Sequence, residues 1–491
     1  MTATGRWAVL GAMALVGGGC GGDDGGTEPP PPPGGTTTLV YVTGRGQTGL
    51  VSEPLDGPFV VEARLDGEPR EGAEVAWEII DGSGTLSATT LTTDVDGRAS
   101  VTLQFGPDYG LRQVQARLVP DGTPILFDAR AYHPLPLAGG GDNVPDRFTS
   151  DLWLHGDYAY TGTWGAITRN GNFGDVLKVW QLGAEGAPAL VREVPIPDIS
   201  TVSDVEVSAD GALLLATTEG QSADGLYLFS LADPSDPTPV DFEPVASGLH
   251  TGTFAEIGGA RYVFAARNPG SPALMVWRID PAAPDPITPV GSVAIPADYG
   301  IHDTFVRDGL AFVSAWNTGL IIYDVGDGRA GGSPASPREV SRIVTSANGV
   351  PGGPAVHNAW WFHNPVTSEK RYVFVGQEGP GAIGSSSSGD LHVVDVSNLA
   401  NPVEVASLRI PGAGVHNFWM DEPREILYAA FYNGGVVALD VSGTLSGNLT
   451  GRIMGQARPG GSSTYVWGVM AHRGSLYLSD MVTGLWQLTP P

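Results

Sequence analysis

Four short segments follow one another between His302 and Val340: HD at 302–303, LAFV at 310–313, GLIIYDV at 319–325 and PREV at 337–340. The second and third are runs of Val, Ile, Leu and aromatic residues, which favour β-strands, and Gly or Pro turns separate the runs. The segments therefore predict one unit of four short strands, about fifty residues long.

The same plan recurs seven times between Ser150 and Leu488, and this repetition predicts an all-β, seven-bladed β-propeller. The seven units start at Ser150-Asp151, Ser203-Asp204, His250-Thr251, His302-Asp303, His357-Asn358, His416-Asn417 and Trp467-Gly468. The last unit ends after its third strand, GLWQL at 484–488, and so lacks an outer strand. We expect residues 134–138 to supply that strand.

The third strands and the residues after them carry a family resemblance. YLFSLADP at 227–234 and VVDVSN at 393–398 resemble the repeats of LVIVD-type β-propellers. The resemblance implies that the propeller occupies residues 134–491. It implies no biochemical role, because a fold alone does not determine function.

Residues 38–133 alternate apolar and polar side chains in several short runs, which predicts a β-sandwich. GAEVAW at 72–77, GSGTL at 82–86 and TTDVDGRA at 92–99 resemble bacterial Ig-like domains of the invasin type. That resemblance implies a spacer or adhesion module at the cell surface.

The N-terminus has the features of an export signal. Arg6 precedes an apolar stretch at 7–16 and the only cysteine, Cys20, which predicts a signal peptide at 1–19. The spacing resembles a bacterial lipoprotein signal, whose cysteine becomes lipidated, although Gly17 stands where that family prefers Leu. An ordinary cleaved signal with an incidental cysteine is the alternative.

Residues 20–37 are rich in Gly, Pro and Thr and predict an extended tether that begins at the lipidated cysteine. We therefore expect an exported lipoprotein of the outer membrane or cell surface that contacts the membrane only through its lipid anchor. The net charge of −27 argues against nucleic acid and anionic lipid as partners. An extracellular protein, a glycan or a small ligand remains as the expected partner.

Four consecutive units start with histidine, namely His250, His302, His357 and His416. Equivalent positions of neighbouring blades converge at one mouth of the propeller channel, where these imidazoles could share a copper, zinc or iron ion. Asp303 could assist or orient a ring. Alternatively, these positions only tie neighbouring blades together through backbone hydrogen bonds. Because adjacent strand residues face opposite ways, the pattern alone does not decide whether the histidines or the residues after them face the channel.

Several tryptophans follow the same starts, and we expect Trp360, Trp361, Trp419 and Trp467 to form an aromatic rim that holds a sugar or an apolar ligand. Packing between blades is the alternative interpretation of these aromatic residues. The histidines at 155, 363, 392 and 472 are interpreted as solvent or turn residues.

Two functions are consistent with these features. The first is a binding or interaction platform without catalysis, displayed on an Ig-like stalk. The alternative is a metalloenzyme or metal-binding protein that uses the histidines, and a third interpretation, a pure scaffold, has no ligand. Sequence motifs for acyl transfer and nucleotide hydrolysis are lacking.

Overall fold

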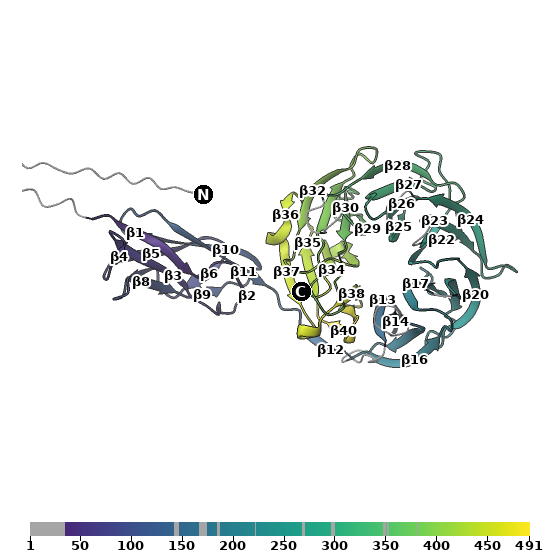
Figure 1. Cartoon of the computed structure of the whole chain (residues 1–491), viewed down its shortest axis with the longest axis horizontal. Coiled ribbons are helices and arrows are strands. Elements are labelled where there is room, and N and C mark those ends of the chain that lie inside the picture. Colours follow the sequence, from purple (N-terminus) through teal and green to yellow (C-terminus); the bar gives the residue numbers. More distant parts are fainter. Residues whose placement is uncertain are drawn as a thin grey trace, which may run out of the picture.

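The computed structural model describes residues 35–141, 147–165, 174–183, 187–220, 222–267, 271–295, 300–346, 350, 353–379 and 381–491. The predicted signal peptide, Cys20 and nearly all of the tether lie outside this range. The described residues form two bodies, a small one at the N-terminal side and a ring of sheets (Figure 1). Among the described residues, no helix is both long enough and apolar enough to cross a membrane.

The smaller body consists of β-sheets around one core. One sheet contains β1 (Thr37–Thr43), β3 (Phe59–Leu65), β4 (Glu68–Pro69) and β8 (Arg98–Val101). The other contains β2 (Gln47–Leu50), β5 (Glu74–Asp81), β7 (Thr90–Thr92), β10 (Gly110–Leu118) and β11 (Ile125–Tyr132), and β6 (Gly84–Leu86) pairs with β9 (Leu103–Phe105). Alternation along the strands directs one face of each sheet inward, so that Phe59, Trp77 and Phe127 bury their side chains in a shared core.

Seven sheets follow around the ring. Their innermost strands contact one another in sequence around the axis, and the last of them contacts the first. The innermost strands are β13 (Phe148–His155), β17 (Thr201–Val207), β21 (Thr251–Ile257), β25 (Asp303–Arg307), β29 (Val356–Phe362), β33 (Phe418–Asp421) and β38 (Val466–His472). The second strands are β14 (Tyr158–Trp164), β18 (Leu213–Glu219), β22 (Ala260–Arg267), β26 (Leu310–Ser314), β30 (Tyr372–Gln377), β34 (Ile426–Ala430) and β39 (Ser475–Asp480).

Farther from the axis, the four main strands of each sheet are antiparallel, and the fourth is the outer strand. The third strands are β15 (Val176–Gln181), β19 (Gly225–Ser230), β23 (Ala273–Ile279), β27 (Leu320–Asp324), β31 (Leu391–Asp395), β35 (Val436–Asp440) and β40 (Gly484–Leu488). The outer strands are β16 (Ala189–Pro195), β20 (Thr238–Pro244), β24 (Ile287–Ala294), β28 (Arg338–Ile343), β32 (Val403–Leu408), β37 (Ile453–Ala457) and β12 (Leu137–Gly140). The short strand β36 (Gly447–Asn448) adds to β32, and η1 (Glu422–Arg424), η2 (Leu449–Arg452) and η3 (Gly461–Ser463) are single 3₁₀ turns.

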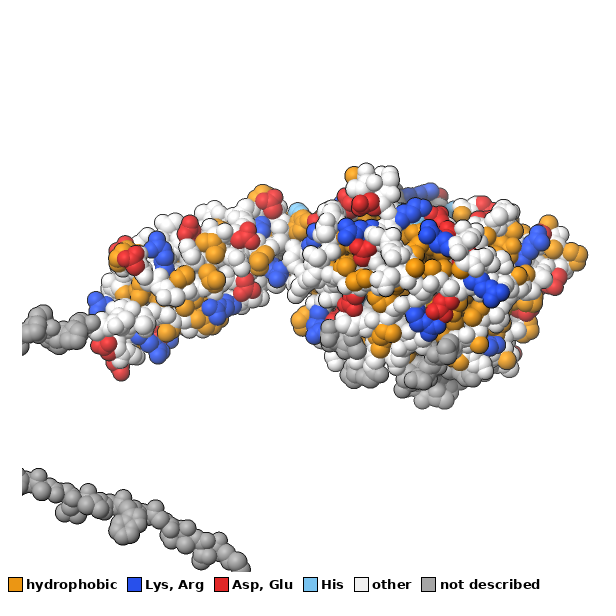
Figure 2. Space-filling view, turned by 90° about the horizontal axis from the view of Figure 1, so that it is seen from above, with side chains coloured by type: hydrophobic (Ala, Val, Ile, Leu, Met, Phe, Trp, Pro, Cys, Tyr) orange, Lys and Arg blue, Asp and Glu red, His pale blue; other side chains and the backbone are white. Residues whose placement is uncertain are grey.

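The second and third strands are covered on both faces by neighbouring sheets, which explains their continuous apolar runs. All five residues of β26 and all five of β27 are buried, as the segments at 310–313 and 319–325 predicted. Figure 2 shows acidic and basic side chains interspersed over the face in view, with hydrophobic side chains between them.

The ring closes between its two ends. Strand β12 pairs antiparallel with β40, so that Leu137 lies opposite Leu488 and Gly140 opposite Trp486. The prediction that residues just before the first unit supply the missing outer strand is confirmed, with the strand slightly later than predicted.

Polar contacts join the two bodies. The His133 backbone N–H donates to the Met454 carbonyl at 2.6 Å. His133, which follows β11, thereby forms an isolated parallel bridge with Gly455 of β37. The Tyr109 hydroxyl donates to Asp440 Oδ2 at 2.6 Å. Burial and this contact raise the pKa of the Tyr109 phenol, so the hydroxyl keeps its proton in the bond.

The closing strand pair should contribute strongly to stability. Leu488 is fully buried against residues of neighbouring strands, so Leu488→Ala should lower the free energy of unfolding by about 2–5 kcal/mol. Urea unfolding measures this, with Leu190→Ala on the exposed face of β16 as the control. Equal, small losses for both variants would contradict a structural role for the closure.

Candidate metal centre and ring axis

β-Bulges at the start of the innermost strands set the direction of the site residues. Val356 pairs with Gln377 and Asn358 with Gly376, so His357 between them has no partner in the ladder. The same shift leaves Trp467 and Ser203 unpaired in their strands. A bulge interrupts the alternation of side chains, which allows two consecutive residues to face the axis.

The four predicted histidines lie side by side in a row, here called the histidine row: His250, His302, His357 and His416. Neighbouring rings have centroids 4.0, 4.1 and 4.1 Å apart along the row. Trp467, at the same position of the next unit, continues the row with its ring centroid 4.3 Å from that of His416. The expected convergence of the four histidines is therefore present in the structure.

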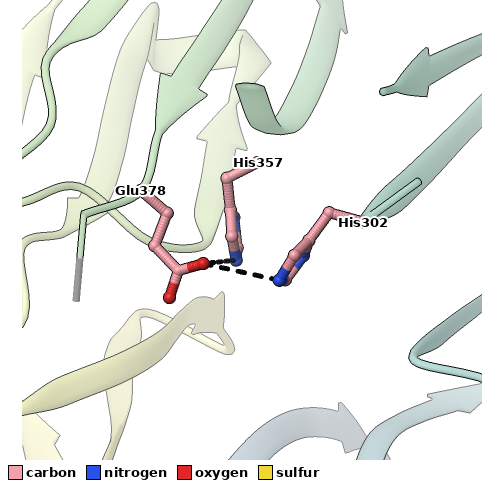
Figure 3. A group of neighbouring side chains, drawn as sticks. All are labelled: His302, His357 and Glu378. Atoms are coloured by element: carbon pink, nitrogen blue, oxygen red, sulfur yellow. Dashed lines mark ion pairs between the residues drawn. The ribbon is translucent and has the colours of Figure 1, made fainter. Parts of the chain in front are cut away.

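Glu378, directly after β30, brings a carboxylate to the row (Figure 3). Its Oε2 lies 3.4 Å from His302 Nε2 and 3.7 Å from His357 Nε2, and its Oε1 lies 4.0 Å from His416 Nε2. The Tyr432 hydroxyl donates a short hydrogen bond to Oε1. Atoms of His302, His357 and Glu378 that can ligate a metal all lie within 4.8 Å of one another.

These separations are long for hydrogen bonds. Two ligand atoms, each about 2.1 Å from one zinc-sized ion at tetrahedral or octahedral angles, lie about 3.0–3.4 Å apart. The 3.4 Å between Glu378 Oε2 and His302 Nε2 falls in this range, whereas the other atoms would move closer together around a shared ion. Neither nitrogen of His357 has a hydrogen-bond partner among the described residues, and His302 Nδ1 and His416 Nε2 also lack one. The side chains of this group are at most 9 % exposed. Two imidazoles and a carboxylate are a common ligand set for iron and zinc.

Burial and the neighbouring histidines hold the pKa values of His302, His357 and His416 well below the usual histidine range. The imidazoles are therefore neutral, which is the state that binds metals. His416 Nδ1 lies 2.8 Å from the Trp467 carbonyl, which can only accept, so this nitrogen carries the proton and Nε2 presents its lone pair.

His250 differs from the other three. Burial alone would lower its pKa, but Glu219 lies 3.1 Å from its Nδ1 and reverses the shift, so that the pKa is raised. His250 therefore forms an ion pair when protonated and is the least suited of the row to ligate a metal.

Glu378 was not predicted, although it occupies a repeat position. It lies two residues beyond Gly376, the partner of Asn358. In three other units, the residue two positions beyond the equivalent partner also contacts the histidine row. These residues are Glu219, which contacts His250, Trp316, which contacts His302, and Tyr432, which contacts His416. Aligning the ends of the second strands would have identified this set.

Asp303 does not join the histidines, so its predicted role at the metal centre is corrected. Its carboxyl accepts from the Thr304 backbone N–H at 2.7 Å and lies with the carboxyls of Asp151, Asp204 and Glu206 nearer the axis. Burial, followed by the charge of Asp204, raises the pKa of Asp303 to about 7. Burial also raises the pKa values of the other three carboxyls.

Polar residues at the unit starts also tie neighbouring sheets together, as the alternative interpretation predicted. The Thr251 hydroxyl donates to the His302 carbonyl at 2.9 Å, and Asn358 Nδ2 donates to the His416 carbonyl at 2.8 Å. The histidines can therefore bind a metal and also link neighbouring sheets, because their backbone carbonyls accept these hydrogen bonds and their imidazoles remain free to ligate an ion.

The four predicted tryptophans do not form one rim. Trp467 lies in the row, whereas Trp360 and Trp419 lie three residues beyond the unit starts with ring centroids 5.4 Å apart. Trp361 faces the opposite way from Trp360, because successive side chains of a strand alternate, and packs against Phe312.

The interpretation of His392 as a solvent or turn residue is wrong. Its side chain is fully buried on β31, with Nδ1 2.8 Å from Glu404 Oε1. His472 Nε2, at the end of β38, lies 2.8 Å from the Gly156 carbonyl. His363 is only 13 % exposed, and burial lowers its pKa to about 4.

A family model described as the LVIVD repeat matches residues 146–167 and 386–409. No curated protein matches the sequence. The β-propeller domain of Cps50 (Swd1) from Myceliophteria thermophila has a TM-score of 0.51 at 11 % identity, over 73 % of this chain and 100 % of that chain. Sqt1 from Chaetomium thermophilum has a TM-score of 0.46 at 14 % identity, over 72 % and 86 % of the two chains. The chain is all-β and contains a β-propeller, as predicted.

The raised pKa of Glu206 makes stability depend on pH. The folded protein holds the Glu206 proton more tightly than the unfolded chain, whose glutamate pKa is near 4.5. Relative to Glu206→Gln, the wild type should therefore lose up to about 1.4 kcal/mol of unfolding free energy per pH unit as the pH rises above about 4.5.

Urea unfolding of both proteins from about pH 4.5 to about pH 7 measures the difference. Glu193→Gln, on the exposed strand β16, is the control. Parallel profiles for wild type and Glu206→Gln would show that the buried carboxyl does not titrate differently in the two states.

Proposed function

We propose that the propeller is a metal-binding module that holds one divalent transition-metal ion through His302 Nε2, His357 Nε2 and Glu378. The observation that carries the proposal is the approach of two buried imidazoles to one carboxylate, with His357 Nε2 and the nearby His416 Nε2 lacking a hydrogen-bond partner among the described residues. Unpartnered buried polar atoms are costly, and a shared ion would satisfy several of them together.

His416 is the candidate fourth ligand, because its Nε2 lone pair lies near the same carboxylate. Tyr432 would orient Glu378 through its hydrogen bond, as an outer-sphere partner of a metal ligand does. With three or four protein ligands, the ion would keep a position for an exogenous oxygen or nitrogen ligand. Copper, zinc and iron all suit imidazole and carboxylate ligands, and iron and zinc suit this combination well.

We further propose how the module is displayed. The seven sheets would be the blades of a seven-bladed LVIVD-type propeller at 134–491, and the two-sheet body would be an Ig-like stalk at 38–133. A signal peptide at 1–19 and a tether at 20–37 with a lipidated Cys20 would place the protein at the outer membrane or cell surface. A propeller fold suggests an interaction platform, and in this proposal the platform presents the metal-bound ligand to an extracellular partner.

Metal analysis tests the proposed centre. Protein purified without a histidine tag, exposed to zinc, copper or ferrous iron and then desalted, should retain about one ion per chain by mass spectrometry. His302→Ala/His357→Ala and, separately, Glu378→Gln should each lose the ion. Binding should raise the unfolding free energy by about 2.7 kcal/mol at a free metal concentration of about 100 Kd.

His155→Ala is the matched control, because His155 lies at the other end of the innermost strand β13. Folded wild-type protein that retains no more metal than the double variant would reject the centre. Equal retention by wild type and all variants would place the metal elsewhere.

Membrane association tests the proposed anchor. In a bacterial host, wild-type protein should label with palmitate and sediment with membranes, whereas Cys20→Ser should do neither. The reason is that the cysteine thiol is the acceptor of the lipid. Release of the wild type into the soluble fraction without label would favour the ordinary cleaved signal.

A further inference from the structure

A cavity of about 950 Å³ lies at the end of the ring axis away from the histidine row. Its walls include Trp153, Phe305, Trp360 and Trp419, which we call the aromatic wall. These residues lie three positions beyond the unit starts, about 10 Å along the innermost strands from the histidines. The cavity is therefore separate from the candidate metal centre.

The aromatic wall is continuous. The ring centroid of Trp360 lies 5.1 Å from that of Phe305 and 5.4 Å from that of Trp419, and Trp419 lies 6.2 Å from Trp153 in an edge-on arrangement. All four side chains are only partly buried. The Trp360 indole N–H is buried without a hydrogen-bond partner among the described residues.

Carboxyls lie behind the wall. Glu206 occupies the same strand position as the aromatic residues in its unit, since Glu206 pairs with Leu215 as Trp153 pairs with Tyr160. Asp151 and Asp204 lie two residues nearer the starts of their units than Trp153 and Glu206 do. Glu206 accepts from the Phe254 backbone N–H at 3.3 Å and Asp204 accepts from the Gly252 backbone N–H at 2.7 Å, and neither residue lines the cavity.

The cations at the cavity mouth are already paired. Arg307 forms two hydrogen bonds with Glu422, and Arg473 pairs with Asp157. Arg424 lies 3.9 Å from Asp421 and donates to the C-terminal Pro491 carbonyl. These contacts direct the arginines to acceptors around the mouth and reduce their repulsion of a positively charged ligand.

We propose that this cavity is a binding site for a quaternary alkylammonium compound of the choline type. Several aromatic faces around a cation provide cation–π attraction, and Trp is the strongest donor of that attraction. The site goes beyond the proposed metal centre and does not depend on it.

The aromatic wall distinguishes this ligand from a neutral one. Cation–π attraction acts on an ammonium group and not on a neutral group of the same shape. The volume also suits a small ligand, because binding cavities commonly measure about 300–1,000 Å³.

Isothermal titration calorimetry with choline and with its neutral isostere 3,3-dimethylbutan-1-ol tests the site on the full chain. We expect choline to bind at least about tenfold more tightly than the neutral alcohol, which corresponds to about 1.4 kcal/mol. Trp419→Leu should weaken choline binding at least about tenfold, and Trp419→Phe less than Trp419→Leu, because the ring is retained.

One control variant separates this site from the general effect of losing an indole. Trp486→Phe removes an indole of the last sheet outside the cavity and should leave choline binding unchanged. Urea midpoints of all variants show whether each is folded. Absence of choline binding to folded wild type, equal affinity for choline and the alcohol, or full binding by folded Trp419→Leu would each overturn the proposal.

Discussion

The antiparallel pairing of β12 with β40 is the constraint on which the rest of the ring depends. Segments almost 350 residues apart in the chain supply one sheet, and without β12 the edge of β40 would remain unpaired. Closure places β13 against β38, so the innermost strands form a complete circle. Only in a complete circle do equivalent residues of separate units face a common axis. The histidine row, the carboxyls and the aromatic wall are thus products of one backbone pairing far from all of them.

Within that circle, a local irregularity decides which side chains meet. A regular strand would direct His357 and Asn358 to opposite faces, but the bulge between Val356 and Asn358 frees both from strict alternation. His357 then contacts its neighbours in the row while Asn358 hydrogen-bonds to the next sheet. The same backbone feature recurs at Ser203 and Trp467, where the side chains are not imidazoles. The backbone of the repeat therefore directs this position toward the axis, and the residue type at the position decides the chemistry of the row.

The sequence predicted the repeats, the missing outer strand and the convergence of the four histidines, because each follows from periodicity that is visible along the chain. It did not predict Glu378, because that residue follows a second strand and only the pairing register of β29 with β30 places it beside the row. Asp303 was assigned to the histidines because the two residues are adjacent in sequence, yet its carboxyl lies with Asp204 and Glu206. Trp360 and Trp361 were grouped together, whereas alternation along β29 places them on opposite faces. Side-chain direction at a bulge and contacts between nonequivalent strands are three-dimensional properties that spacing alone does not encode.

The charges along the axis do not by themselves determine which ligands the two ends of the ring favour. At one end, burial keeps His302, His357 and His416 neutral, so Glu378 is the main charged ligand available to a metal ion. Farther along, Asp151, Asp204, Glu206 and Asp303 have no described Lys or Arg partner, and burial raises the pKa of each. Carboxyls with raised pKa values hold their protons more tightly, so the contacts at each end, rather than these charges, distinguish the two proposed ligands. Imidazole lone pairs favour a transition metal, whereas tryptophan faces favour a large, weakly hydrated organic cation that cannot be ligated.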